Sequence, residues 1–209
     1  MPPTEETSAL LECNLDELWA RIQRDGPWGY VPEPDEIALV ADEDWERSAS
    51  QQARRRTFLA FYSYAVPDRA SIAAIAAFVH ERTVLEVGAG SGLWAKLLAA
   101  AGVKVIATDG KEASPSDYFP IATQEAEAAV LAHGECGVLL LCWPPFKNRL
   151  AVRALRAFRG ERFIYVADTR FTADGEFHEL LEQGWELKDR LPIPAWPGFE
   201  DHVYLYSRI

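Results

Sequence analysis

VLEVGAGSGLWAKLLAAAGVKVIATDG, residues 84–110, is the stretch that decides the fold. Its apolar start predicts a strand, its glycines a tight turn, and the Ala- and Leu-rich run at 93–101 a helix. Gly102 stands where a helix stop is expected. The β-branched run 103–107 then predicts a second strand, which ends at Asp109. Strand–turn–helix–strand units of this kind bind a nucleoside at the carboxyl ends of the strands.

The glycine spacing and two acids indicate which nucleoside. The pattern Gly88-x-Gly90-x-Gly92 places the third small residue one position earlier than the dinucleotide fingerprint does. Glu86, two residues before the turn, would oppose the phosphates of a dinucleotide but can accept hydrogen bonds from an amino group. Asp109 can accept both hydroxyls of a ribose. A glycine turn that serves only strand–helix packing is the alternative.

With these residues the chain resembles the class I S-adenosylmethionine-dependent methyltransferases, whose first motif has the form E-x-G-x-G-x-G. The resemblance covers about residues 60–209. It implies an α/β fold with a seven-stranded, mostly parallel sheet, an antiparallel last strand, and helices on both faces. Residues 1–66 would form an N-terminal helical cap on a core of residues 67–209, and the two together one compact domain.

The resemblance also implies the cofactor S-adenosylmethionine and a set of residues to hold it. Trp94 would border the methionine end, Asp109 the ribose, and Thr123 and Gln124 the adenine ring. The full expected set is Glu86, Gly88, Ala89, Gly90, Gly92, Trp94, Asp109, Gly110, Thr123, Gln124 and Cys142.

Length and composition limit the possible size of the core, the partners and the cellular compartment. The chain of 209 residues is 49% hydrophobic, enough for one substantial core. Its net charge of −11 argues against binding to a nucleic-acid backbone, so nucleic acid is not expected as a partner. No signal peptide opens the chain, no apolar run is long enough to span a bilayer, and the three cysteines have neither metal nor disulfide spacing. We expect a cytoplasmic protein without a bound metal; the sequence does not predict its oligomeric state.

The remaining elements follow from hydrophobic periodicity and turn residues. Helices are predicted from Ser8 or Asn14 to about Arg24, and over 48–64, 67–80, 123–133 (with Thr123 as a candidate N-cap), 150–158 and 175–183. Strands are predicted over 118–122, 137–142, 163–167, 185–191 and 202–207. Residues 28–34 are expected to be irregular. The acidic run 33–46 and the basic run 54–56 are interpreted as solvated faces.

A second informative stretch, LLLCWPPF at 139–146, follows the fourth predicted strand. It resembles the Asp/Asn/Ser-Pro-Pro-Tyr/Phe motif of enzymes that methylate amino groups, with Pro144, Pro145 and Phe146 matching. Trp143 stands in the first position, where an indole donates one hydrogen bond and accepts none. The Cys-Trp-Pro-Pro form resembles a little-characterised branch of the family. A rigid exit from the strand, packed on an aromatic ring, is the alternative interpretation.

Methyl transfer from an activated donor depends mainly on positioning. The candidate catalytic residues are Trp143 in this motif, and Asp168, Tyr64 and His202 as bases. The acceptor pocket is expected between residues 61–67, 142–146 and 192–201, because ligands lie outside the carboxyl ends of parallel strands.

The leading hypothesis is a methyltransferase acting on the nitrogen or oxygen of a small molecule. The first alternative is a protein or nucleic-acid N-methyltransferase that uses the Pro-Pro motif. The second is a non-catalytic binding protein with a cofactor-type fold.

Overall fold

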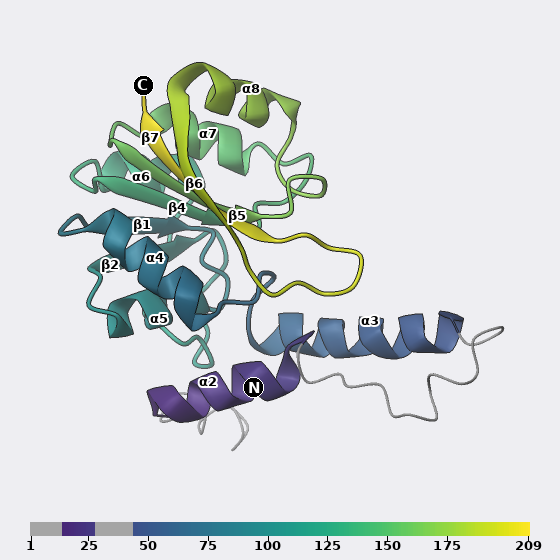
Figure 1. Ribbon diagram of the computed structural model, residues 1–209. Coiled ribbons are helices and arrows are strands. Elements are labelled where there is room, and N and C mark those ends of the chain that lie inside the picture. Colours follow the sequence, from purple (N-terminus) through teal and green to yellow (C-terminus); the bar gives the residue numbers. More distant parts are fainter. Residues whose placement is uncertain (1–13, 28–43) are drawn as a thin grey trace.

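A seven-stranded sheet forms the centre of the computed structural model, which describes residues 14–27 and 44–209 (Figure 1). The strands lie in the order β3-β2-β1-β4-β5-β7-β6. Strands β1 to β5 pair in parallel, whereas the last strand, β7, is antiparallel to both β5 and β6. The strands are β1 (Val84–Val87), β2 (Val105–Asp109), β3 (Ile121–Thr123), β4 (Val138–Cys142), β5 (Arg162–Ala167), β6 (Trp185–Pro192) and β7 (His202–Arg208). The expected fold class is confirmed.

Helices cover both faces of this sheet (Figure 1). They are α2 (Leu15–Asp25), α3 (Asp44–Phe61), α4 (Arg69–Val79), α5 (Leu93–Ala100), α6 (Ala126–Ala132), α7 (Leu150–Ala157) and α8 (Gly175–Gly184). Three of them begin at predicted or recognisable N-caps: the side chains of Asn14, Asp68 and Asp174 accept hydrogen bonds from backbone N–H groups of the first turn.

The central strands alternate between two cores. Leu140 and Ile164 pack in a cluster with side chains of α2, α4 and α5, whereas Leu139 and Phe163 pack with side chains of α6, α7 and α8. Because successive side chains of a strand point to opposite faces, a strand buried on both faces needs a continuous apolar run. The run 138–141 has that composition and is fully buried. Glu86 interrupts such a run in β1.

The first two described helices share the core of the sheet. Leu18 and Ile22 of α2 and Phe58 of α3 belong to the same buried cluster as Ile72 of α4 and Val203 of β7. In Figure 1, α2 and α3 lie together on the side of the molecule that carries α5 and the connection between β6 and β7. The division into a cap and a core at residue 66 stays a prediction.

Two sequence expectations need correction, and three others fall on residues that the structure does not describe. Thr123 is not a helix cap, because it pairs with Asp109 as the last residue of β3, and Glu125 takes the N-cap position of α6. Helix α3 runs over 44–61 rather than 48–64, and residues 62–64 follow it as an irregular, bent segment. The cap at Ser8, the irregular stretch 28–34 and the acidic residues 33–43 lie outside the described residues.

Candidate functional site

Backbone hydrogen bonds to strand β2 hold the glycine turn between β1 and α5 in place. The N–H groups of Gly88 and Ala89 both donate to the carbonyl of Thr108 on β2, at 2.9 and 3.0 Å. Gly88, Gly90 and Gly92 have φ values of 71°, 62° and 73°, which favour glycine because side chains rarely adopt them. A Cβ at Gly92 would also lie 3.0 Å from the Cβ of Phe119. The spacing read from the sequence is therefore required by the shape of this turn.

Asp109 lies at the end of β2 beside the turn. Its two carboxylate oxygens accept hydrogen bonds from the backbone N–H groups of Gly90, at 2.8 Å, and Lys111, at 3.0 Å. The side chain stays partly exposed. Each oxygen keeps a second lone pair for another donor.

A cavity of about 370 Å³ opens against the glycine turn. It is lined by residues 59–64, Glu86, residues 88–91, Trp94, Lys111, Ser114, Ser116, Asp117 and Cys142. Of the expected cofactor set, the structure thus brings Glu86, Gly88, Ala89, Gly90, Trp94 and Cys142 to one cavity. The segment 61–67 contributes four of the lining residues, which matches its expected place over the turn.

Glu86 is the buried acid of this cavity. Its side chain is only 1% exposed, and Oε2 has no hydrogen-bond partner among the described residues. Burial raises the pKa of Glu86 to about 8, against a hydrogen bond from the Ala95 backbone that lowers it, and Asp109 adds a smaller increase. The carboxyl group is therefore largely protonated near neutral pH and retains one unused oxygen at the cavity wall.

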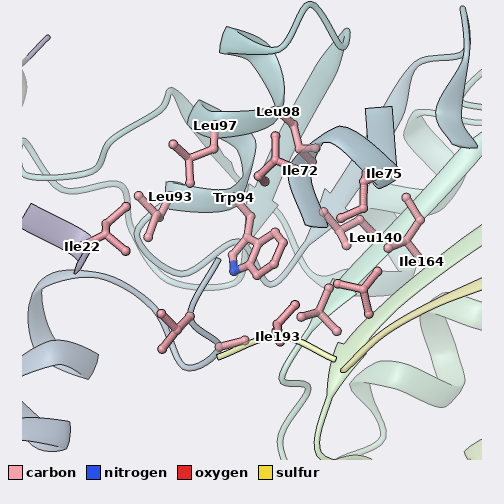
Figure 2. Close-up of a cluster of buried hydrophobic side chains, with 14 of the residues drawn as sticks. Ile22, Ile72, Ile75, Leu93, Trp94, Leu97, Leu98, Leu140, Ile164 and Ile193 are labelled. Atoms are coloured by element: carbon pink, nitrogen blue, oxygen red, sulfur yellow. The ribbon is translucent and has the colours of Figure 1, made fainter. Parts of the chain in front are cut away.

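Trp94 provides the complementary group. It is buried, it lines the same cavity, and its Nε1 has no partner within the described ranges. Figure 2 shows its indole nitrogen on the side of the ring turned away from Ile75 and Leu140. The residues that line one cavity thus include an unused buried N–H donor and an unused carboxyl oxygen.

The segment after α3 is tied to the glycine turn. The hydroxyl of Ser91 donates to the carbonyl of Tyr62. The backbone N–H of Tyr118 donates to the carbonyl of Ser91 at 2.7 Å, and the Tyr118 hydroxyl donates to the carbonyl of Phe61 at 2.9 Å. These hydrogen bonds hold the segment that follows α3 in place over the glycine turn.

Cys142 ends β4 at the cavity wall. Burial raises the pKa of its thiol well above the ordinary value, and the nearby carboxyl groups of Glu86 and Asp201 add to this. The side chain is therefore a neutral thiol.

Trp143, the next residue, connects the three segments expected to form the acceptor pocket. Its ring stacks on Tyr64, with centroids 5.7 Å apart, and contacts the ring of Phe199 at the same distance. Its Nε1 donates to Asp201 Oδ1 at 2.7 Å. Its φ of 48° is uncommon for a bulky side chain, and such strain concentrates at functional sites.

Asp201 is the site residue that sequence reasoning missed. It is buried, and burial raises its pKa to about 6 although the hydrogen bond from Trp143 lowers it. The only signal in the sequence is an acid directly before the last strand. The topology brings the segments 142–146 and 192–201 together, but no sequence pattern singles out Asp201 as the partner of Trp143.

Asp168, expected as a base, has a structural position instead. Its carboxylate forms an ion pair with Arg170 at 2.7 Å and accepts the backbone N–H groups of Arg170 and Glu200. Burial alone would raise the pKa of Asp168, but these hydrogen bonds lower it below the ordinary value. A carboxylate with filled oxygens and a low pKa is a poor proton acceptor.

His202 is also engaged elsewhere. Its Nδ1 lies 2.9 Å from the carbonyl of Glu200 and its Nε2 lies 3.1 Å from Arg190 Nη2. Neither His202 nor Asp168 belongs to the described residues that line the cavity. Tyr64 does, and with 54% of its surface exposed it is the candidate base that the structure places at the cavity mouth.

The residues expected at the adenine end lie beside Asp109. The N–H of Gln124 donates to the Asp109 carbonyl at 2.8 Å, and Gln124 Oε1 is buried without a partner in the described chain. A Cβ at Gly110 would lie 3.1 Å from Glu125 Oε1. Gly92, Asp109, Gly110, Thr123 and Gln124 are not among the described lining residues, so this end is separate from the cavity as it stands.

Metal and membrane features were searched over residues 14–27 and 44–209. In that part of the chain no group of three or more His, Cys, Asp and Glu side chains is placed to hold a metal ion. None of the helices described there is long and apolar enough to cross a membrane. The absence of a metal stays a prediction.

Comparisons with known proteins give a fold-level likeness. No protein-family model matches the chain, and no curated protein matches its sequence. TehB from Haemophilus influenzae aligns with a TM-score of 0.52 and 15% identity over 73% of this chain and 66% of that one. Sp1610 from Streptococcus pneumoniae, a candidate tRNA (m1A22) methyltransferase in complex with S-adenosyl-L-methionine, aligns with a TM-score of 0.50 and 15% identity over 68% and 73%. A protein of the NADB-Rossmann superfamily from Streptococcus agalactiae aligns with a TM-score of 0.50 and 10% identity over 69% and 70%.

These likenesses show a Rossmann-like fold. The chain spans just under two thirds of the length of TehB and 48% of the length of TrmN from Thermus thermophilus, which is 16% identical. Activity and substrate therefore have to be argued from the site.

Proposed function

We propose that this protein is an S-adenosylmethionine-dependent methyltransferase that acts on a nitrogen or oxygen of a small-molecule acceptor. The observation that carries the proposal is the pair of unused polar groups in the cavity, Glu86 Oε2 and Trp94 Nε1. Buried polar groups without partners are rare in native proteins, and two of them in one cavity can be completed by a ligand with an acceptor and a donor of its own.

The two groups fit the amino-acid end of the cofactor. An ionised Glu86 accepts hydrogen bonds from an ammonium group, and Trp94 Nε1 donates to a carboxylate. The open space around Gly90, where a Cβ would meet no atom within 4 Å, leaves room for a ligand against the turn. A dinucleotide would instead place phosphate charge near Glu86, which is unfavourable.

Asp109 and Gln124 would hold the nucleoside end. The second lone pairs of the Asp109 carboxylate suit ribose hydroxyls, and the unpartnered Gln124 Oε1 suits the amino group of adenine. This assignment follows the resemblance of the E-x-G-x-G-x-G motif, and the Sp1610 structure with bound S-adenosyl-L-methionine supports it at the level of the fold.

When bound, S-adenosylmethionine supplies a methyl group already activated on a sulfonium. The chain then has to bind, orient and exclude water. The segment 61–64 covers the glycine turn, and the rings of Tyr64 and Trp143 provide a flat apolar surface next to it. Positioning of this kind accounts for much of the rate of such transfers.

The test is calorimetric titration of the purified protein with S-adenosylhomocysteine and with NAD⁺. We expect the first to bind and the second not to. Trp94→Phe should lower the affinity for S-adenosylhomocysteine by about tenfold, because one hydrogen bond to a charged group is lost. Trp196→Phe is the matched control, since Trp196 is also buried with an unpartnered Nε1 but does not belong to the described cavity lining. Binding of NAD⁺ alone, or equal losses in both variants, would contradict the proposal.

A nucleic-acid acceptor is the second candidate, and one surface feature favours it. Phe146 of the Pro-Pro motif is exposed, and a neighbouring surface cavity is lined by three basic side chains and two acidic ones: Lys147, Arg149, Arg153, Glu125 and Glu127. Exposed aromatic and basic side chains together suit single-stranded nucleic acid. Transfer of labelled methyl groups to total tRNA, abolished in Phe146→Ala, would favour this candidate over a small molecule.

A further inference from the structure

The basic run 54–56 separates into three different environments. Arg54 Nη2 donates to the carbonyls of Arg24 and Gly26, at 3.4 and 3.5 Å, and so links α3 to the end of α2. Arg56 is exposed. Arg55 turns toward the aromatic rim of the site, where its Cζ lies 4.2 Å from the ring centroid of Phe199 and 5.7 Å from that of Trp143. Only Arg55 is therefore a candidate for ligand recognition.

Arg55 has unused donors. Its guanidinium is partly buried, which lowers its pKa, and its Nε is inaccessible. Across the described residues it makes neither a hydrogen bond nor an ion pair, although it feels the charge of Asp201. A guanidinium carries five N–H donors, and burying them unsatisfied is costly.

Asp201 has an unused acceptor on the same rim. Oδ1 is taken by Trp143 Nε1 at 2.7 Å, and no hydrogen bond to Oδ2 occurs in the described part of the chain. Asp201 also lies close enough to Cys142 on the cavity wall to influence its thiol. The rim therefore has one donor group and one acceptor group that keep hydrogen-bonding capacity for a ligand.

The signs of these two groups restrict that ligand. A carboxylate or phosphate would gain from Arg55 but would meet the negative charge of Asp201. An amine cation would gain from Asp201 but would meet Arg55. A neutral planar ring with an N–H next to a carbonyl satisfies both, and its face can stack on Tyr64, which is half exposed.

We propose that the acceptor is a neutral heteroaromatic lactam, stacked on the exposed ring of Tyr64, with its carbonyl accepting from Arg55 and its ring N–H donating to Asp201. The inference rests on the proposed function, which it deepens by giving the substrate class. It makes Arg55 and Asp201 residues that determine specificity.

The probe is lumazine, a fluorescent lactam with ring N–H groups beside carbonyls, titrated with and without S-adenosylhomocysteine. Its matched control is 1,3-dimethyllumazine, which lacks those N–H groups. We expect lumazine to bind below about 1 mM and the dimethyl compound about tenfold more weakly. Benzoate and tyramine represent the anionic and cationic classes and should bind more weakly than lumazine.

The variants are Arg55→Gln and Asp201→Asn, with Arg56→Gln as the exposed neighbour on the same helix. Each of the first two substitutions should lower the affinity for lumazine by about tenfold, whereas Arg56→Gln should change this affinity by less than about twofold. Asn at 201 can still accept from Trp143 Nε1, so the local fold is retained, and melting curves check this for each variant.

Several results would overturn the inference: no lumazine binding at about 1 mM, equal binding of the dimethyl compound, tighter binding of benzoate or tyramine, or an equal loss in Arg56→Gln. Failure of the wild-type protein to bind S-adenosylhomocysteine would instead overturn the proposed function. The lumazine titration without cofactor is independent of that result.

Discussion

Glu86 and Asp168 are buried to the same degree, each with 1% of its surface exposed, and both stand at the end of the parallel sheet where ligands bind. Their surroundings are opposite. The oxygens of Asp168 are filled by Arg170 and by two backbone N–H groups, whereas Glu86 keeps one oxygen without a partner. The pKa of Asp168 is lowered, and that of Glu86 is raised to about 8.

The difference separates a structural acid, Asp168, from Glu86, the acid to which the proposed function gives a binding role. A carboxylate that protein donors satisfy holds a loop in place and has nothing left for a ligand. A carboxyl group left unsatisfied in a cavity destabilises the empty protein and is stabilised when a cation arrives. Burial alone does not distinguish the two roles; the hydrogen-bond partners do.

The largest expected effect concerns Glu86→Gln and the pH dependence of stability. The pKa of Glu86 is raised in the folded state, so its contribution to stability is present below the unfolded value of about 4.5 and is lost as pH rises toward about 8. Over that window the wild-type protein should lose about 3–5 kcal/mol relative to Glu86→Gln. Denaturant unfolding of both proteins at several pH values measures the difference. Parallel pH curves would show that Glu86 is not protonated in the fold.

Asp168→Ala should have the next largest effect, and on stability only. It leaves the backbone N–H of Glu200 without its acceptor and frees Arg170, which costs about 1–3 kcal/mol. Asp168→Asn should recover part of this loss. The affinity for S-adenosylhomocysteine, measured by calorimetry, should stay within about twofold. A stable Asp168→Ala protein that no longer binds the cofactor product would reverse the comparison with Glu86.

A smaller effect is expected on the pH dependence of binding. If the ammonium group of S-adenosylhomocysteine ionises Glu86, binding releases a proton, and the affinity should rise by about tenfold per pH unit, or about 1.4 kcal/mol, between pH 6 and 8. Calorimetry in two buffers of different ionisation enthalpy counts the protons. Glu86→Gln should release none. Equal proton release by both proteins would assign the proton to another group.

The smallest effect is expected for His202→Gln. Both ring nitrogens of His202 already lie beside protein atoms, outside the described lining of the cavity. Stability and cofactor affinity should change by less than about 0.5 kcal/mol. A large loss of methyl transfer in a normally folded His202→Gln protein would restore the expectation that it acts as a base.

The sequence predicted the parts of the molecule that depend on neighbours along the chain. The strand, turn and helix over 84–100 follow from apolar runs and from glycines with positive φ, so the sequence was enough to predict both the fold and this turn. The meeting of the segments 61–67, 142–146 and 192–201 followed from parallel-sheet topology, and the contacts of Trp143 bear it out.

The features that depend on partners far away in the sequence could not be predicted. Asp168 looks like a catalytic acid until Glu200, thirty-two positions away, donates to it. Thr123 resembles a helix cap until pairing with β2 draws it into a strand. The topology placed Asp201 in the predicted pocket segment, but its hydrogen bond with Trp143 and the position of Arg55 over the ring of Trp143 are visible only in the structure.

The neutral thiol of Cys142 bears on self-damage in a protein with the proposed activity. A nucleophile on the wall of a cavity that holds an electrophilic methyl group would capture that group and inactivate its own enzyme. Thiolates react in this way and thiols react far more slowly. By burying Cys142 beside two carboxyl groups, the fold keeps this sulfur protonated. Prolonged incubation with S-adenosylmethionine should therefore leave the mass of the protein unchanged.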